Sequence, residues 1–360
     1  MYKKVMTKNE LRAFTRFPYN LYKDDAKWFP PVLGVREQDF DRRLNPPLAE
    51  VDCELYLVQG AGPAPNEVLG RIAAMVNRRY NAYQKEKTAF FGFFECVDDP
   101  IVAKSLLAAA GKFAVARGMQ RIMGPIDFST NYPCGVVIKG GHLPPTVTTP
   151  YTKPYYSRLM EACGYRKAMD YYAYTYQRSQ GIPERMARLR PPLEKRYPGL
   201  VVRPLRRKDI RRDMAALGEV LNAAFADNWG FVPLSGREFE VMRQGFLSLN
   251  CLDTVLLATV DSRPAGILIA IPDINQKKID RLRLSILGVK PEFRGRGIET
   301  LLILKLLDFF YRHGYREIDC SLILENNIPM NTFIGKEFGC PLTRVFRVYE
   351  KPCGLAGNCC

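Results

Sequence analysis

Two arginines and two glycines alternate at Arg294, Gly295, Arg296 and Gly297, after an apolar segment and before a stretch with helical periodicity. The start of a helix presents backbone N–H groups without intrahelical acceptors, together with partial positive charge from the helix dipole. Glycine allows a bulky anion to approach that backbone, and arginine adds fixed positive charge. The segment therefore predicts a cradle for a phosphate or pyrophosphate group.

The four letters alone are weak evidence, because a turn on a basic surface gives the same pattern. The segment is not a P-loop, since G-x-x-x-x-G-K-[ST] is absent, and it lacks the G-x-G-x-x-G of a dinucleotide-binding fold. The context is more informative. Residues 284–289 (LSILGV) are apolar on both faces, which predicts a central strand, and residues 297–314 follow with the apolar spacing of a helix.

The second half of the chain contains an ordered series of such elements. The pattern predicts a strand–turn–strand at 253–271, strands at 281–289, 316–323 and 343–351, and helices at 297–314 and 326–339. The first half repeats this order with little identity, through a hairpin at 54–77, strands at 88–96, 119–128 and 173–177, and helices at 100–118 and 155–165. We therefore expect a duplicated α/β unit.

The expected organisation is a first unit at 1–178, a basic linker helix at 179–200, a second unit at 201–352 and a flexible tail at 353–360. Residues 178–212 hold twelve Lys or Arg against three Asp or Glu. They are interpreted either as a contact for phosphate or anionic lipid, or as a solvated linker. An insertion at 131–156 in the first copy, rich in Gly, Pro and Tyr, predicts either a substrate-facing lid or a surface loop.

The composition restricts location and partners. The chain has 360 residues, 47% hydrophobic residues and a formal charge of +16. We find no apolar run of membrane-spanning length and no signal peptide, so a cytoplasmic protein is expected. The charge suits a polyanion, an anionic membrane face or a phosphorylated cofactor, and equally a protein that is merely basic. The ten cysteines include no CxxC pair, and no metal site is expected.

Residues 281–350 resemble the cofactor-binding half of the GNAT (Gcn5-related N-acetyltransferase) superfamily. Its signature, Q/R-x-x-G-x-G/A, lies between the fourth strand and the third helix, and Arg294, Arg296 and Gly297 occupy that pattern. The resemblance implies two tandem GNAT-like units, each a mixed, mostly antiparallel twisted sheet flanked by helices. It also implies acyl-CoA as co-substrate, bound by Leu287, Gly288, Val289, Arg294, Gly295, Arg296, Gly297, Ile298 and Asn327.

Two positions depart from the GNAT pattern. Glu299 stands where the signature ends on a small residue, and we interpret it as a first-turn helix residue that favours the dipole or pairs with an arginine. Many GNAT enzymes have a tyrosine on the fourth helix that protonates the leaving thiolate. Here Ile334 and Gly335 occupy that stretch, so no general acid is assigned.

The resemblance implies direct transfer of an acyl group from the CoA thioester to an amine. The strand carrying the cradle is expected to separate from its neighbour, with the pantetheine arm in the gap and backbone N–H groups of 287–289 facing the thioester oxygen. The amine must lose a proton, which requires a carboxylate or a water relay. The candidates are Glu325, Asp319 and Glu95. Glu325 is equally interpretable as part of a helix cap, and Glu95 as an exposed strand end.

The first copy has Asp98 and Asp99 where the second has its glycine loop, and carboxylates disfavour phosphate. We therefore expect one cofactor site, in the second half, with the first half shaping the acceptor or acyl pocket. GNAT folds often line the acceptor site with the segment that here reads NWGF (228–231). The candidate substrate contacts are Asn228, Trp229, Tyr155 and Tyr156; Trp229 is equally interpretable as a core residue.

Three longer stretches, FPYNLYKDDAKWFPP, FFGFFE and RGRGIE, are similar to a bacterial group of large GNAT proteins associated with long-chain N-acylation, which includes ceramide synthases. This resemblance implies a lipid amine or sphingoid base as acceptor, and a protein that docks on an anionic leaflet. Two alternatives stay open. One is an aminoacyl-tRNA-dependent transferase, in which the basic surface faces tRNA. The other is an acyl-CoA sensor without catalysis.

Overall fold

The computed structural model of the chain describes residues 1–31, 35–60 and 67–354. It divides into two compact units. Unit 1 comprises Met1–Tyr171, Gly230–Val232 and the C-terminal strand from Arg344, and unit 2 comprises Tyr172–Trp229 and Pro233–Thr343. The chain passes from unit 1 to unit 2 within β7 (Arg166–Gln177) and returns within β13 (Leu342–Pro352). Of the tail expected at 353–360, residues 355–360 lie outside the described residues, and the Cys353 N–H donates to the Gln120 carbonyl at 2.8 Å.

The unit 1 sheet has the strand order β1-β2-β3-β4-β5-β13, and β6 also pairs with β13. Its strands are β1 (Tyr2–Lys4), β2 (Val51–Gln59), β3 (Val68–Asn77), β4 (Thr88–Cys96), β5 (Arg121–Gly124) and β6 (Val136–Lys139), and its helices are α1 (Lys8–Leu21), α2 (Val35–Gln38), α3 (Arg78–Gln84), α4 (Pro100–Ala116) and α5 (Tyr156–Ala162). Strands β2, β3 and β4 are antiparallel, and α4 carries the chain to β5, which runs parallel to β4.

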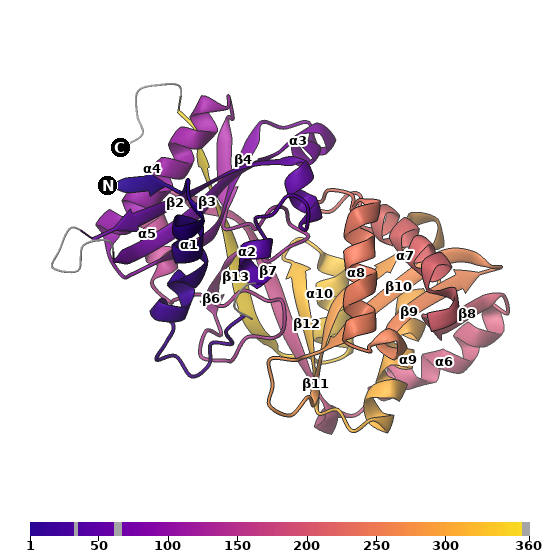
Figure 1. Cartoon of the computed structure of the whole chain (residues 1–360). Coiled ribbons are helices and arrows are strands. Elements are labelled where there is room, and N and C mark those ends of the chain that lie inside the picture. The colour runs from indigo at the N-terminus through magenta and orange to yellow at the C-terminus, as the bar shows by residue number, and fades with distance from the viewer. Residues whose placement is uncertain (32–34, 61–66, 355–360) are drawn as a thin grey trace. The chain divides into compact units, whose positions relative to one another are not determined.

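The unit 2 sheet has the order β7-β12-β11-β10-β9-β8 (Figure 1). Its strands are β8 (Leu200–Pro204), β9 (Val255–Val260), β10 (Arg263–Pro272), β11 (Arg281–Val289) and β12 (Glu317–Leu324), and its helices are α6 (Glu184–Arg196), α7 (Ile210–Ala224), α8 (Gly236–Ser248), α9 (Ile298–Arg312) and α10 (Ile328–Thr332). Strands β9, β10 and β11 are antiparallel, and α9 carries the chain to β12, which runs parallel to β11. The order of unit 1 is thus repeated, as the sequence predicts.

Each unit is held by its own apolar core between sheet and crossover helix. In unit 1, Phe91 of β4 and Leu106 and Phe113 of α4 belong to one buried cluster. In unit 2, Leu282 of β11 and Leu302 of α9 belong to another. Because each helix buries its apolar face against its own sheet, the start of that helix is fixed against the strand that precedes it.

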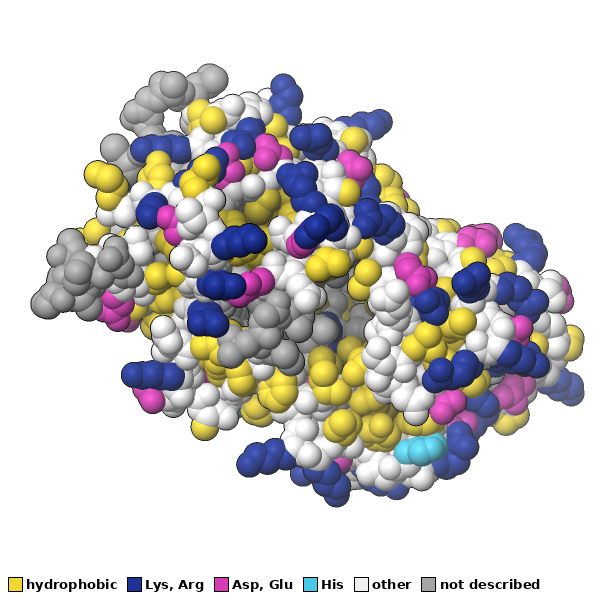
Figure 2. Space-filling view, viewed as in Figure 1, with side chains coloured by type: hydrophobic (Ala, Val, Ile, Leu, Met, Phe, Trp, Pro, Cys, Tyr) yellow, Lys and Arg dark blue, Asp and Glu magenta, His cyan; other side chains and the backbone are white. Residues whose placement is uncertain are grey.

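Two further properties of the protein are the distribution of charged side chains on its surface and the length of its apolar helices. In the face drawn in Figure 2, Lys and Arg side chains are distributed over the whole view, with Asp and Glu side chains among them. None of the described helices combines the length and the apolar composition that crossing a bilayer requires.

Candidate active site

The predicted cradle is a loop between β11 and α9. Gly295 and Gly297 both adopt a left-handed backbone conformation with φ of 72°, which favours glycine. In the described part of the chain no side chain caps α9, and the first of its amides to find a backbone acceptor is that of Leu301, which donates to the Gly297 carbonyl. Among the described residues, the six consecutive N–H groups from Gly295 to Thr300 have no acceptor. This is the arrangement that binds an anion.

The two arginines of the loop also brace it. The Arg294 guanidinium donates to the Val289 carbonyl at 3.3 Å and to the Ala224 carbonyl, at the end of α7, at 3.0 Å. The Arg296 guanidinium donates to the Glu292 carbonyl at 3.2 Å. Both side chains place positive charge next to the cradle. They also hold the backbone of the loop in its conformation, which the sequence did not reveal.

The surroundings of the two glycines differ. A Cβ at Gly295 would meet no atom within 4 Å, so that side of the loop is open. A Cβ at Gly297 would stand 2.7 Å from Leu193 of α6, which packs along α9 (Figure 1). The expected basic linker is therefore a helix whose apolar side closes one flank of the cradle. Its cations are largely paired: Arg185 lies 2.7 Å from Glu337, and Arg190 lies 3.1 Å from Asp308.

Strands β11 and β12 stop pairing with each other before the chain reaches the cradle. Their parallel register runs from Arg281 with Glu317 to Leu284 with Cys320 and then stops. Beyond that point Ser285 forms a bulge against β10, where the register shifts. Residues 285–287 on β11 and 322–323 on β12 become half-exposed there, whereas the paired residues before them are almost all buried. The sequence-based expectation of a separation after this strand agrees with this geometry.

The backbone of β11 identifies which amides face the separation. The Lys290 N–H donates to the Ala265 carbonyl of β10 at 2.9 Å, and Gly288 and Val289 are in register with Ile267 and Gly266. Antiparallel residues alternate between facing the partner strand and facing away. The amide of Gly288 is therefore directed to β10, while those of Leu287 and Val289 are directed to the side that β12 has left.

At the matching place, the described residues of unit 1 form neither an uncapped helix start nor an open gap beside the strand. The Asp99 carboxylate caps α4 and accepts from the Ile101 N–H at 2.7 Å, so the helix start is already occupied by a negative charge. The gap beside β4 is filled by the chain itself, because the Ile126 N–H donates to the Phe91 carbonyl at 2.8 Å. A Cβ at Gly92 would stand 2.4 Å from the Ile126 carbonyl oxygen. Within the part of the chain that the structure describes, these contacts favour an anion cradle in unit 2 and not at the matching place in unit 1.

The two candidate carboxylates of unit 2 have different surroundings. Asp319 is 2% exposed within the paired part of β12, where it accepts a hydrogen bond from the Ser321 hydroxyl. Arg283, its partner in register, donates to the same hydroxyl at 3.1 Å. Asp319 thus belongs to a buried polar network in the sheet. Glu325 is half-exposed directly after β12, at the end where the strands have separated.

Asn327, two residues after Glu325, was expected to contact the cofactor. Asn327 accepts from the Met330 N–H at 3.2 Å and caps α10, which gives this side chain a structural role. The residue that sequence reasoning missed is Asn331, whose amide donates to the Leu324 and Glu325 carbonyls at 2.9 and 3.2 Å. Asn331 therefore holds the end of β12 in place.

A tyrosine from another strand lies beside Gly335, in the stretch of the chain that has no tyrosine of its own. Tyr174 of β7 donates to Asn331 at 3.2 Å, and its ring stands 3.1 Å from an ideal Cβ at Gly335. Burial raises the pKa of Tyr174, so it keeps its proton at neutral pH. No local signal could have found this pair, because more than 150 residues separate Tyr174 from Asn331.

Glu95 in unit 1 is held by two tyrosines. Its carboxylate accepts from the hydroxyls of Tyr156 at 2.6 Å and Tyr22 at 2.8 Å. Burial raises the pKa of Glu95, although Arg71 and the two hydroxyls act in the opposite direction. Tyr156 is fully buried, and Tyr155 donates to the Cys96 carbonyl at 2.8 Å. Three of the sequence-predicted site residues therefore meet here, in a place where they also pack the core.

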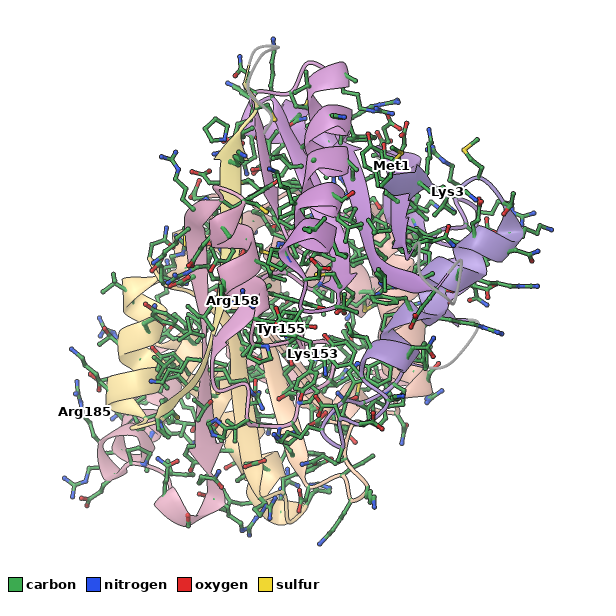
Figure 3. The ribbon with its side chains drawn as sticks, turned by 90° about the vertical axis from the view of Figure 1, so that its left-hand side faces the viewer. Met1, Lys3, Lys153, Tyr155, Arg158 and Arg185 are labelled. Atoms are coloured by element: carbon green, nitrogen blue, oxygen red, sulfur yellow. The ribbon has the colours of Figure 1, made fainter. Side chains whose placement is uncertain are left out.

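The insertion at 131–156 lines a cavity of about 540 Å³ in unit 1. Lys139, His142 and Lys153 contribute to its wall. Figure 3 labels Lys153 and Tyr155 next to each other in its view of the molecule. Among the described lining residues the acidic groups are engaged: Asp25 accepts from Tyr151 and Glu161 from Tyr349.

The other predicted acceptor contacts, Asn228 and Trp229, are half-buried at the end of the turn that follows α7. The next three residues, Gly230–Val232, belong to unit 1, where Thr130 donates to the Gly230 carbonyl at 2.6 Å. Among the described residues no group of three or more Cys, His, Asp or Glu is arranged to hold a metal ion, and Cys359 and Cys360 lie outside them.

Comparison with solved structures identifies the fold. A tandem GNAT protein from the clavulanic acid biosynthesis pathway matches with a TM-score of 0.59 and 14% identity, over 99% of each chain. A GCN5-related N-acetyltransferase from Sphaerobacter thermophilus matches with a TM-score of 0.54 and 15% identity, over 99% of this chain and 96% of that one. The chain therefore has a tandem GNAT fold.

Two curated proteins are similar over nearly the whole sequence. Protein YghO of Escherichia coli (strain K12) is 29% identical, over 96% of this chain and 94% of its own length. A bacterial ceramide synthase of Caulobacter vibrioides (strain NA1000 / CB15N) is 27% identical, over 96% of each. No family model matches the sequence.

Proposed function

We propose that the protein is an acyl-CoA-dependent N-acyltransferase that transfers a long-chain acyl group to a primary amine, with a lipid amine or sphingoid base as the acceptor. The observation that carries the proposal is the open cradle of six backbone amides from Gly295 to Thr300, placed directly after the separation of β11 from β12. Such amides suit the pyrophosphate of CoA, and the separation suits its pantetheine arm. The ceramide synthase relative supports the choice of acceptor.

The reaction follows from these groups. The neutral amine attacks the thioester carbonyl carbon, a C–N bond forms, and negative charge moves to the carbonyl oxygen. The amides of Leu287 and Val289 stabilise that charge. The C–S bond then breaks, the ammonium loses its proton through Glu325 or a bound water, and the CoA thiolate takes one up. Tyr174, whose phenol keeps its proton at neutral pH, is the candidate donor.

The test uses purified protein with palmitoyl-CoA and sphinganine, and measures both thiol release and N-acyl product by mass spectrometry. Gly295→Glu places a carboxylate in the cradle at a position where the side chain meets open space. It is expected to raise the KM for palmitoyl-CoA by at least about tenfold, because like charges repel at short range.

Gly314→Glu is the matched control. Gly314 also has φ of 72° and open space around it, but it lies after the other end of α9, away from the cradle. Both variants carry the same added charge and backbone strain. Equal effects of the two substitutions would contradict the cradle assignment. Stoichiometric binding of palmitoyl-CoA without turnover on any amine would identify a sensor instead.

A further inference from the structure

The connection between β10 and β11 joins the ends of two central strands of the unit 2 sheet (Figure 1), and some of its apolar side chains are exposed to solvent. Ile274 and Ile279 are 41% and 48% exposed. Between them stand Lys277 and Lys278, which are also exposed and have no ion-pair partner among the described residues. Single exposed aliphatic residues are common, but two branched ones around two unpaired cations form a defined amphipathic tip.

This tip is not a loose loop. At its base the Asp273 carboxylate is fully buried and lies 2.5 Å from the Arg281 guanidinium, and the Asp273 N–H donates to the Arg281 carbonyl. The Gln276 side chain accepts from the amides of Asp280 and Arg281 at 3.3 and 3.1 Å. The hydrogen bonds fix the backbone, so the two isoleucines point outward in a conformation that the fold imposes.

A rigid, cationic and apolar tip is complementary to an anionic membrane surface. The isoleucines suit the boundary between headgroups and acyl chains, and the lysines suit the anionic headgroups. Nucleic acid fits less well, because the tip offers aliphatic groups and no aromatic ring for base stacking. We infer that the hairpin tip formed by Ile274, Lys277, Lys278 and Ile279 docks the protein on anionic lipid.

The inference rests on the proposed function in one respect: docking would give the enzyme access to a lipid acceptor. Binding is therefore measured without any acyl donor, by co-sedimentation of the full chain with vesicles of phosphatidylcholine alone or with phosphatidylglycerol added. Wild-type protein is expected to bind the anionic vesicles at least about tenfold more tightly, with binding that weakens as salt is raised. Equal binding to both vesicle types, or no binding, would overturn the inference.

Two double variants test the tip itself. Lys277→Glu with Lys278→Glu is expected to weaken binding to anionic vesicles by more than about tenfold. Ile274→Ser with Ile279→Ser is expected to weaken it severalfold at all salt concentrations. All four side chains are exposed, so folding is expected to be retained, and circular dichroism checks it.

Matched controls change the same chemistry elsewhere on the surface. Lys85→Glu with Lys87→Glu makes the same charge change on exposed residues of unit 1, and Ile101→Ser with Val241→Ser removes two other exposed aliphatic side chains. Controls as weak in binding as the tip variants would show that general charge or apolarity is responsible and would overturn the inference. Acyl transfer in detergent micelles is expected to be unchanged in the tip variants, and its loss in wild-type protein would count against the proposed function alone.

Discussion

Leu193 of α6 occupies the space in which a side chain at Gly297 would stand, with 2.7 Å between Leu193 Cδ2 and an ideal Cβ. Gly297 is the last residue of the cradle before α9, so the linker helix and the cradle are built against each other. The glycine is required both by this contact and by its φ of 72°.

The first prediction follows from that contact. Gly297→Ala is expected to destabilise the protein by more than about 2 kcal/mol, because the left-handed backbone costs about 1–2 kcal/mol for alanine and the overlap with Leu193 adds to it. Leu193→Ala in the same chain is expected to restore about 1 kcal/mol of the loss. Urea unfolding of the two single variants and the double variant measures this, and strictly additive effects would contradict the contact.

Glu299 provides a second prediction. It lies in the first turn of α9, and the structure gives it no ion pair or side-chain hydrogen bond among the described residues. Of the two interpretations offered for Glu299, pairing with an arginine of the loop is not seen among the described residues, and its place in the first turn of α9 is. Glu299→Gln removes a negative charge near the cradle without changing the helix, so CoA should bind as tightly or severalfold more tightly. Calorimetric titration with CoA checks this, and weaker binding would show that Glu299 organises the loop.

The pH dependence of Glu95 provides a third. Burial raises its folded-state pKa above that of the unfolded chain, so its ionisation destabilises the fold as pH rises through the folded value. Below the unfolded pKa the group is protonated in both states and contributes nothing. Glu95→Gln is therefore expected to be at least as stable as wild-type protein at pH 8, with the advantage disappearing toward pH 4. Denaturant titrations at several pH values measure it; a constant difference across pH would contradict this account.

The fourth prediction separates the two carboxylates of unit 2. Glu325→Gln is expected to lower kcat by about a hundredfold, with the KM for acyl-CoA little changed, because the proposed reaction uses Glu325 as a proton acceptor. Asp319→Asn is expected to cost about 2–3 kcal/mol of stability instead, because Asp319 is buried in the network with Ser321. Steady-state kinetics and thermal unfolding of both variants measure this. The reverse pattern would transfer the catalytic role to Asp319.

The sequence alone determined the strands and the helix that carry the cradle, and their order. Apolar spacing placed the crossover helix at 297–314, close to the observed Ile298–Arg312, and the strand at 88–96 coincides with β4. The position of Arg294 and Gly297 between a strand and a helix predicted the cradle, because glycine conformation and helix starts are local properties of the chain.

Tertiary structure decided what each side chain does there. The sequence assigned Arg294 to the ligand alone, but its guanidinium also binds the Ala224 carbonyl, 70 residues away. It could not show that Leu193 closes the flank of Gly297, or that Tyr174 fills the space beside Gly335. It could not show the return of the C-terminal strand to unit 1, either. Such contacts join residues far apart in the chain, and local periodicity does not encode which strand or helix a segment will meet.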